Sequence, residues 1–338
     1  AVPIGWRFII ASDFCARRPW PTGSGAPRSA LASPRPGIIE EPAPGVSQPL
    51  AYIGGRFGRI GLVRMDTGLA VHVHRHIHLI AGVGGADTLF HVRGRALPVT
   101  AERAVLVDAW APHGWRHRRG APPTTFLTFY LEPGWVRDRL GFATAADASL
   151  LSDPQVVLDN AARRSIAALA QLLSSAAGAA GPQAGIDDLI ATLLSAVLAP
   201  RSHRGMPLPA AARLQDHRIR RAFGLLHDGQ KVEIDAVARE VGLSRPRFFE
   251  LFRDCTGLTP GCVANAGRME RAIQGLTQSR QPLGALALDL GYAAQGNFTR
   301  FFKQQIGISP ASYRRAALPA GLVGQVAAGR VWACGGPG

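Results

Sequence analysis

The amino-acid sequence predicts an α+β protein with an N-terminal β domain, then helices, then a C-terminal domain of helices alone. Residues 52–133 contain short β-branched and aromatic runs separated by glycine and proline, as in strands joined by turns. Residues 134–200 carry apolar residues three and four apart, which is the period of amphipathic helices. The last ~100 residues repeat one helical unit. At 338 residues the chain exceeds the usual ~100–200 of one domain.

Composition excludes a wholly disordered chain and favours a negatively charged partner. Hydrophobic residues make up 47% of the chain and charged residues 18%, which is enough apolar material for buried cores. Lysine and arginine number 38 against 23 acidic residues, so the net charge is +15. Such a field attracts polyanions such as nucleic acid or an anionic membrane surface. Nearly all of this charge is arginine, so a coding bias would explain the basicity equally well.

The domain boundaries follow from shifts in composition. Residues 1–48 are rich in proline, glycine, serine and arginine without a sustained period, and we expect a disordered extension. We then expect a β domain at 49–133, a helical coupling or dimerisation segment at 134–199, a linker at 200–213, a helical domain at 214–316 and a tail at 317–338. The segment 134–199 would serve equally well to pack against the β domain. No basic leader precedes the apolar run at 2–10, so we expect a cytoplasmic protein without a membrane partner.

The strongest signal is an internal repeat at an offset of fifty residues. Residues 248–253 and 257–260 read FFELFR and GLTP, and residues 298–303 and 307–310 read FTRFFK and GISP. Upstream of each copy an alanine precedes a glycine by four residues: Ala238 and Gly242, then Ala287 and Gly291. A small alanine lets two helices cross closely, and glycine adopts the unusual dihedrals of the turn. The repeat therefore predicts two helix-turn-helix units.

Helical spacing separates a buried from an exposed face in the second helix of each unit. In the first unit Ser244 is expected to cap the helix, with Pro246 in its first turn. At 100° per residue the buried positions are Phe248, Leu251, Phe252 and Cys255, then Phe298, Phe301 and Phe302. The exposed positions are Pro246, Phe249, Glu250 and Arg253, then Gly296, Thr299, Arg300 and Lys303, with Gln295 and Asn297 at the second helix start.

Residues 216–315 resemble the double helix-turn-helix DNA-binding domain of AraC/XylS-type transcription regulators. The resemblance rests on the segment 297–303 with Gly307, Pro310 and Tyr313-Arg314, and on a joining helix with Arg268-Met269, Ala272 and Leu276. It implies a non-enzymatic, sequence-specific regulator, an activator under the control of a small-molecule effector. It also implies double-stranded promoter DNA and RNA polymerase as partners, and it leaves a homodimer open.

If each second helix enters a major groove, its exposed residues acquire roles. Arg300 would pair with guanine, Gln295 or Asn297 with adenine, Glu250 with cytosine, and Phe249 would touch a thymine methyl. Thr299 faces the same groove. Arg245, Arg247, Arg253 and Lys303 are placed for phosphates. The alternative is a helical interaction scaffold with solvated charges. The helical domain carries 15 basic against 9 acidic residues, which is compatible with DNA without requiring it.

Alternating histidines mark the β domain. If the segment is one strand, His72, His74, His76 and His78 share a face. Residues 70–132 resemble a cupin-like β-barrel sensor domain through His74-Arg75-His76 and Pro112-His113, without the glutamate expected after the histidine pair. We favour a polar effector pocket or a wet strand face over a metal site, and predict no cofactor. The predicted effector-binding residues are His72, His74, His76, His113 and Trp110, and a metal would use His74, His76 and His113.

A second function class stays open beside the regulator. A metal-dependent cupin enzyme with a DNA-binding-like C-terminal appendage would need a bound metal and an acid/base pair near the histidines. The missing glutamate argues against it.

Overall fold

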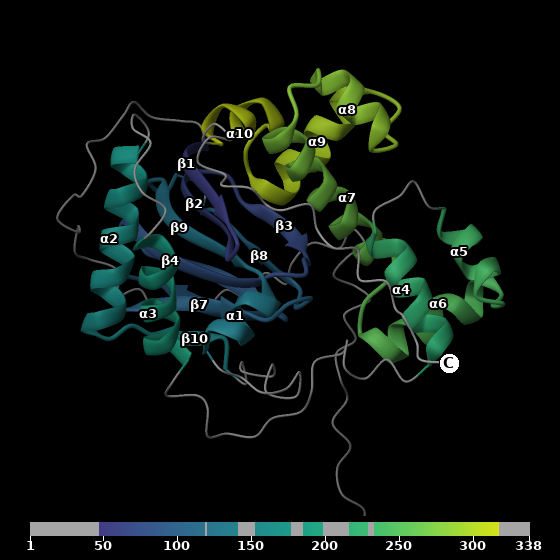
Figure 1. The fold of residues 1–338 in the computed structure, drawn as a ribbon, viewed down its shortest axis with the longest axis horizontal. Helices are drawn as coiled ribbons and strands as arrows, with labels where there is room; N and C mark the ends of the chain where they lie inside the picture. Colours follow the sequence, from purple (N-terminus) through teal and green to yellow (C-terminus); the bar gives the residue numbers. More distant parts are fainter. Residues whose placement is uncertain are drawn as a thin grey trace, which may run out of the picture.

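The computed structural model of the chain describes residues 47–118, 120–140, 153–176, 185–198, 216–228 and 233–317 (Figure 1). The predicted linker at 200–213, the tail after 317 and the N-terminal extension up to residue 46 lie outside the described residues. The predicted fold class is confirmed: a β domain is followed by helices and then by a helical C-terminal domain.

The β domain consists of two antiparallel sheets. A six-stranded sheet has the order β1-β2-β9-β4-β7-β10, and a four-stranded sheet has the order β3-β8-β5-β6. The described strands thus form two hydrogen-bonded sheets and not one closed ring. The strands are β1 (Gln48–Gly55), β2 (Gly58–Met65), β3 (Leu69–His72), β4 (Ile77–Gly85), β5 (Thr88–Val92), β6 (Arg95–Val99), β7 (Arg103–Val107), β8 (His113–Trp115), β9 (Thr124–Leu131) and β10 (Gln155–Val157).

Alternate residues of the strands in the six-stranded sheet point to opposite sides, and both of its faces are buried. Leu79 packs with the helices on the outer face, whereas Ile80 packs with Phe90 and Val92 of the other sheet. The outer face is covered by α2 (Asn160–Ala176) and α3 (Ile186–Leu198), while α1 (Pro133–Leu140) contacts α3 (Figure 1). The three-residue strand β10 was not expected in this helical segment, and it is too short to leave a periodic signal.

The C-terminal domain has two units joined by a long helix. The first contains α4 (His217–His227), α5 (Ile234–Glu240) and α6 (Arg245–Thr256), the joining helix is α7 (Pro260–Gln278), and the second contains α8 (Leu283–Asp289), α9 (Gln295–Ile306) and α10 (Pro310–Ala316). Figure 1 shows α7 running from the first unit towards the second. Among the described residues, no helix combines the length and the apolar character needed to cross a membrane.

The β domain packs against both units. Phe302, Ile308 and Tyr313 of the second unit belong to the apolar cluster that fills the space between the two sheets. The ring centroids of Tyr52 and Tyr313 are 4.4 Å apart. Val73 reaches the first unit, where it joins a cluster with Ile219. The two domains therefore share buried surface.

Candidate functional site

The two helix-turn-helix turns have the same hydrogen bonds. The amide of Leu243 donates to the carbonyl of Ala238 over 2.9 Å, and the amide of Tyr292 donates to the carbonyl of Ala287 over 2.9 Å. The glycine of each turn has a positive φ, 71° at Gly242 and 84° at Gly291, which is the region that side chains with a Cβ disfavour. The internal repeat read from the sequence is therefore a repeat of structure.

The aromatic stripe fixes which face of each recognition helix, α6 or α9, turns outwards. Phe248, Phe252, Phe298 and Phe302 are fully buried, whereas Leu251, Cys255 and Phe301, also expected in the core, are half-buried. Ser244 occupies the cap position of α6 without a side-chain hydrogen bond, and Pro246 lies in the first turn as predicted. Gly257 and Gly307 end the two helices in the left-handed conformation.

On the outward face of α6 the charges of Arg245, Arg247 and Glu250 are already paired. The Arg247 guanidinium donates to the Glu250 carboxylate over 2.7 Å. Arg245 pairs with Asp235 of α5, and its guanidinium lies 5.1 Å from the centroid of the Phe249 ring. Of the residues predicted to contact DNA, Arg245, Arg247 and Glu250 are exposed, while Phe249 and Arg253 are half-buried.

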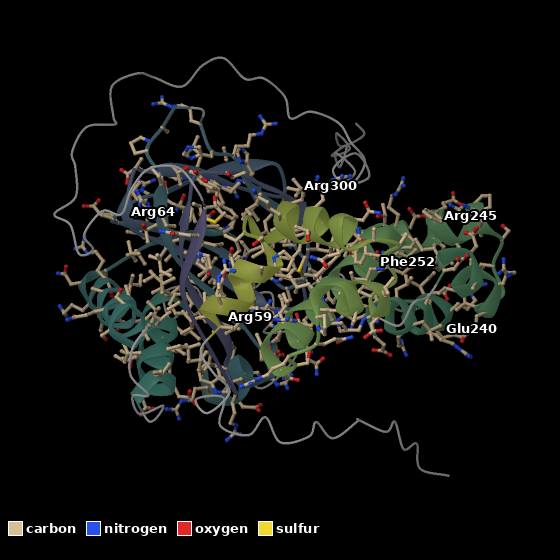
Figure 2. All side chains as sticks on the ribbon, turned by 90° about the horizontal axis from the view of Figure 1, so that it is seen from above. Arg59, Arg64, Glu240, Arg245, Phe252 and Arg300 are labelled. Atoms are coloured by element: carbon tan, nitrogen blue, oxygen red, sulfur yellow. The ribbon has the colours of Figure 1, made fainter. Side chains whose placement is uncertain are left out.

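The outward face of α9 differs in the pairing of its cations. Gln295, Asn297, Arg300 and Lys303 are exposed and Thr299 is half-buried. Within the described part of the chain, neither Arg300 nor Lys303 takes part in an ion pair. Figure 2 shows Arg245 and Arg300 towards the same side of the molecule. Both α6 and α9 therefore carry a cation towards that side.

Four buried histidines form a second cluster, between the two sheets. The prediction that one strand carries all the alternating histidines is wrong. Strand β3 ends at His72, the chain bends at residues 75–76, and β4 begins at Ile77 in the other sheet. The bend brings together imidazoles from both sheets and the connection between them: His72, His74, His78 and His113. The His78 Nδ1 atom lies 3.2 Å from His74 Nε2 and 3.2 Å from His113 Nε2.

Burial keeps this histidine cluster neutral. It holds the pKa of His74, His78 and His113 well below the ordinary value of 6.5, and neighbouring imidazoles lower the pKa of His74 and His78 further. Burial also lowers the pKa of His72, against a hydrogen bond to Ala70 that raises it. Uncharged imidazoles offer lone pairs to a ligand or a metal ion.

Two of the five predicted effector residues lie elsewhere. His76 points away from the cluster, and its Nε2 donates to the Glu132 carboxylate over 3.1 Å. The metal triad His74, His76 and His113 is therefore not assembled. Trp110 packs on α4, with its ring centroid 4.9 Å from that of Phe223. Strict alternation was the wrong assumption, because the bend at residues 75–76 turns the buried His76 towards Glu132 and away from the other histidines.

His76 belongs to a charged cluster between the domains, which the sequence did not reveal. The Arg59 guanidinium of β2 donates to Glu270 of α7 over 3.3 Å, and His76 Nε2 lies 3.8 Å from the same carboxylate. Figure 2 shows Arg59 where the β domain meets the C-terminal helices. Burial raises the pKa of Glu270, but the electrostatic interactions with Arg59, His76 and Arg75 lower it by more, so this pKa lies below its usual value. The cluster thus holds a carboxylate of the joining helix beside the histidine-bearing segment.

Comparison with known proteins places the C-terminal helices in a known class. Residues 237–316 match the family described as a helix-turn-helix domain. The regulatory protein SoxS of Escherichia coli K12 is 34% identical over 88 residues, which are 26% of this chain and 82% of SoxS. An uncharacterized HTH-type transcriptional regulator of Haemophilus influenzae is 32% identical over 105 residues, 30% of this chain and 35% of that protein.

Most of the fold is also shared with a solved structure. ToxT from Vibrio cholerae has a TM-score of 0.50 at 10% identity, over 77% of this chain and 98% of ToxT. By sequence, however, the chain spans about a third of the length of longer relatives such as the Haemophilus protein and the Salmonella typhimurium regulator Rob. The sequence likeness to these two proteins covers 105 and 91 residues, which are 30% and 27% of this chain.

Proposed function

Because the chain belongs to the AraC/XylS family of transcription regulators, we propose that it binds promoter DNA through α6 and α9 and activates transcription in response to a small ligand in its N-terminal domain. The DNA-binding part of this proposal depends on the pair of matching turns. Each turn presents a helix with a buried aromatic stripe and an exposed polar face. Helices presented in this way enter major grooves.

Base reading is proposed to depend mainly on α9. Arg300 has the fork geometry that matches guanine, and Gln295 or Asn297 at the helix start matches adenine. On α6, Glu250 would accept from cytosine only after releasing Arg247. Because each good bidentate contact discriminates by ~1–3 kcal/mol, the cost of breaking that pair reduces the selectivity of the first unit.

Phosphate contacts would position the domain without reading sequence. Besides Arg300, the basic residues of the two helices are Lys303 on α9 and Arg245, Arg247 and Arg253 on α6. With Arg245 and Arg300 towards one side of the molecule (Figure 2), the two helices would follow one face of a duplex. The affinity should therefore fall steeply with salt.

The proposed effector site is the histidine cluster. His72, His74 and His113 line it together with His78. An effector regulates only if it binds two conformations unequally. The contact of His76 with Glu270 of α7 gives the site a physical connection to the joining helix.

The proposal includes RNA polymerase as the protein partner of the activator, a cytoplasmic location and no enzymatic activity. A homodimer is compatible with it, and sedimentation with and without promoter DNA tests that assembly.

Genome-wide mapping of bound DNA, followed by binding to the recovered sites, tests the function. Arg300→Ala should weaken binding to the cognate site by roughly 5- to 150-fold, the equivalent of ~1–3 kcal/mol, and relax one base position. Arg164→Ala on α2 removes the same charge from an exposed position outside the C-terminal domain and is the matched control. Equal affinity and sequence preference in both variants would refute the role of Arg300.

A further inference from the structure

The spacing of the cluster nitrogens is that of ligands around one ion. Two nitrogens bound to a tetrahedral zinc ion at ~2.0–2.1 Å are separated by about 3.3 Å. The two distances from His78 Nδ1, to His74 Nε2 and to His113 Nε2, are each 3.2 Å. The ligand atoms of His72, His74 and His113 lie within 4.8 Å of one another. His72 is therefore the fourth imidazole beside the same point.

Hydrogen bonds outside the cluster set the tautomers. The Nδ1 atom of His113 lies 2.8 Å from the carbonyl of Ala111, and that of His72 lies 2.9 Å from the carbonyl of Ala70. Since a carbonyl only accepts, Nδ1–H donates in both residues, and Nε2 is left with its lone pair. Metal-bound histidines are oriented by the same kind of bond to a backbone carbonyl.

Hydrogen bonds between neutral imidazoles cannot pair all the nitrogens that face one another inside the cluster. His78 Nδ1 carries at most one hydrogen yet faces both His74 and His113. The other ring atoms, His74 Nδ1 and His78 Nε2, are buried and have no hydrogen-bond partner among the residues that the structure describes. One shared proton therefore leaves two nitrogens whose lone pairs face each other. A cation between the rings would bind these lone pairs.

The donor set selects the class of ion. It contains only imidazole nitrogens, because the nearby carboxylate of Glu132 contacts His76, outside the cluster. Imidazole suits zinc, copper, nickel and iron, whereas magnesium and calcium require oxygen ligands. We propose that His74, His78 and His113, together with His72, bind one divalent transition-metal ion, and that this ion is the effector of the regulator.

The segment that carries these ligands also contacts the DNA-binding domain. Val73, between two ligands, packs into the apolar cluster of the first unit with Ile219. The carbonyl of His74 accepts from the amide of Trp110 over 2.8 Å, and Trp110 packs on Phe223 of α4. Drawing the imidazoles onto an ion would therefore move residues that touch both the first unit and, through His76, α7.

Zinc binding to the full chain tests the site. After treatment with a chelator and dialysis, titration with Zn²⁺ should give one equivalent per chain, and Co²⁺ should give the visible absorption of a tetrahedral site. His74→Gln and His113→Gln should each weaken binding by ~10- to 100-fold or more. His117→Gln, whose ring bonds the Ala121 carbonyl outside the cluster, is the control.

Thermal unfolding distinguishes a variant that has lost metal binding from one that has failed to fold. Zn²⁺ should raise the Tm of the wild type and of His117→Gln, because a ligand that binds only the folded state stabilises it. The same addition should leave the Tm of a folded His74→Gln/His113→Gln double variant unchanged. Less than a tenth of an equivalent of Zn²⁺, Co²⁺, Ni²⁺ and Cu²⁺ in the wild type, or undiminished binding in the double variant, would overturn the metal site.

The effector role rests on the proposed function, so it is tested separately on DNA. The affinity of the full chain for a mapped promoter should change at least ~5-fold between Zn²⁺ and chelator, the lower end of typical coupling between two sites. Binding of metal without any change in DNA affinity would overturn the effector role but leave the site. Absence of specific DNA binding in both conditions would contradict the proposed function and not the metal site.

Discussion

Replacing Glu270 by glutamine removes one charge from the contact between the domains. The Arg59 side chain is 13% exposed and that of Glu270 is 31% exposed, so the pair is largely withdrawn from water. Removing one partner of a buried pair costs ~3–5 kcal/mol, because the other charge stays buried. Glutamine still accepts one hydrogen bond, and the guanidinium still lies 4.4 Å from the centroid of the Tyr130 ring. We therefore expect a loss of about 2–3 kcal/mol.

Urea unfolding of the full chain measures this loss against a matched exposed pair. Arg221 and Glu240 are 2.9 Å apart with side chains 65% and 43% exposed, and such pairs contribute ~0–1 kcal/mol. Glu240→Gln should therefore be nearly silent. If Glu270→Gln costs no more than Glu240→Gln, the charged cluster does not hold the domains together, and its proposed role in transmission fails.

Three further predictions follow from the repeat and the charges. Gly257→Ala should cost ~1–2 kcal/mol for the left-handed conformation. Gly307→Ala should lower the stability measured by thermal unfolding by more than Gly257→Ala does, because its Cβ would meet the buried Met65 side chain. Equal losses of stability in the two variants would contradict this packing. The contribution of Glu270, whose pKa is lowered on folding, is present above the unfolded value of ~4.3 and is lost as pH falls through the folded pKa. The stability difference between wild type and Glu270→Gln should shrink in that window, and a difference that persists in acid would count against this. Lys303→Ala should weaken binding to all DNA sequences and lower the salt slope by about one, whereas a sequence-selective loss would reassign Lys303 to base reading.

The helical domain was predictable because its determinants are local. Gly242 and Gly291 are required by the turn dihedrals, and the aromatic stripe follows the helical period. A short range of sequence therefore contains the whole pattern, and the repeat presents it twice. The reading faces of α6 and α9 follow from the same wheel.

The histidine cluster was predictable only in part, because its geometry depends on the bend at residues 75–76. His72, His74 and His113 come together as expected, but alternation placed His76 with them and took His78 for a residue of the same strand. Glu270 lies on a helix over two hundred residues along the chain from Arg59, and no sequence period links them. Contacts of this kind arise from tertiary packing between distant segments, so they leave no local pattern in the sequence.

The affinity of the full chain for a mapped promoter duplex, measured against a scrambled duplex of the same composition over a range of salt concentrations, tests the central claim most directly. Two helix-turn-helix units that read DNA predict a preference of at least ~1,000-fold for the mapped site and a steep fall of both affinities with salt. Equal affinity for the two duplexes, with the protein folded, would contradict the assignment of α6 and α9 as recognition helices.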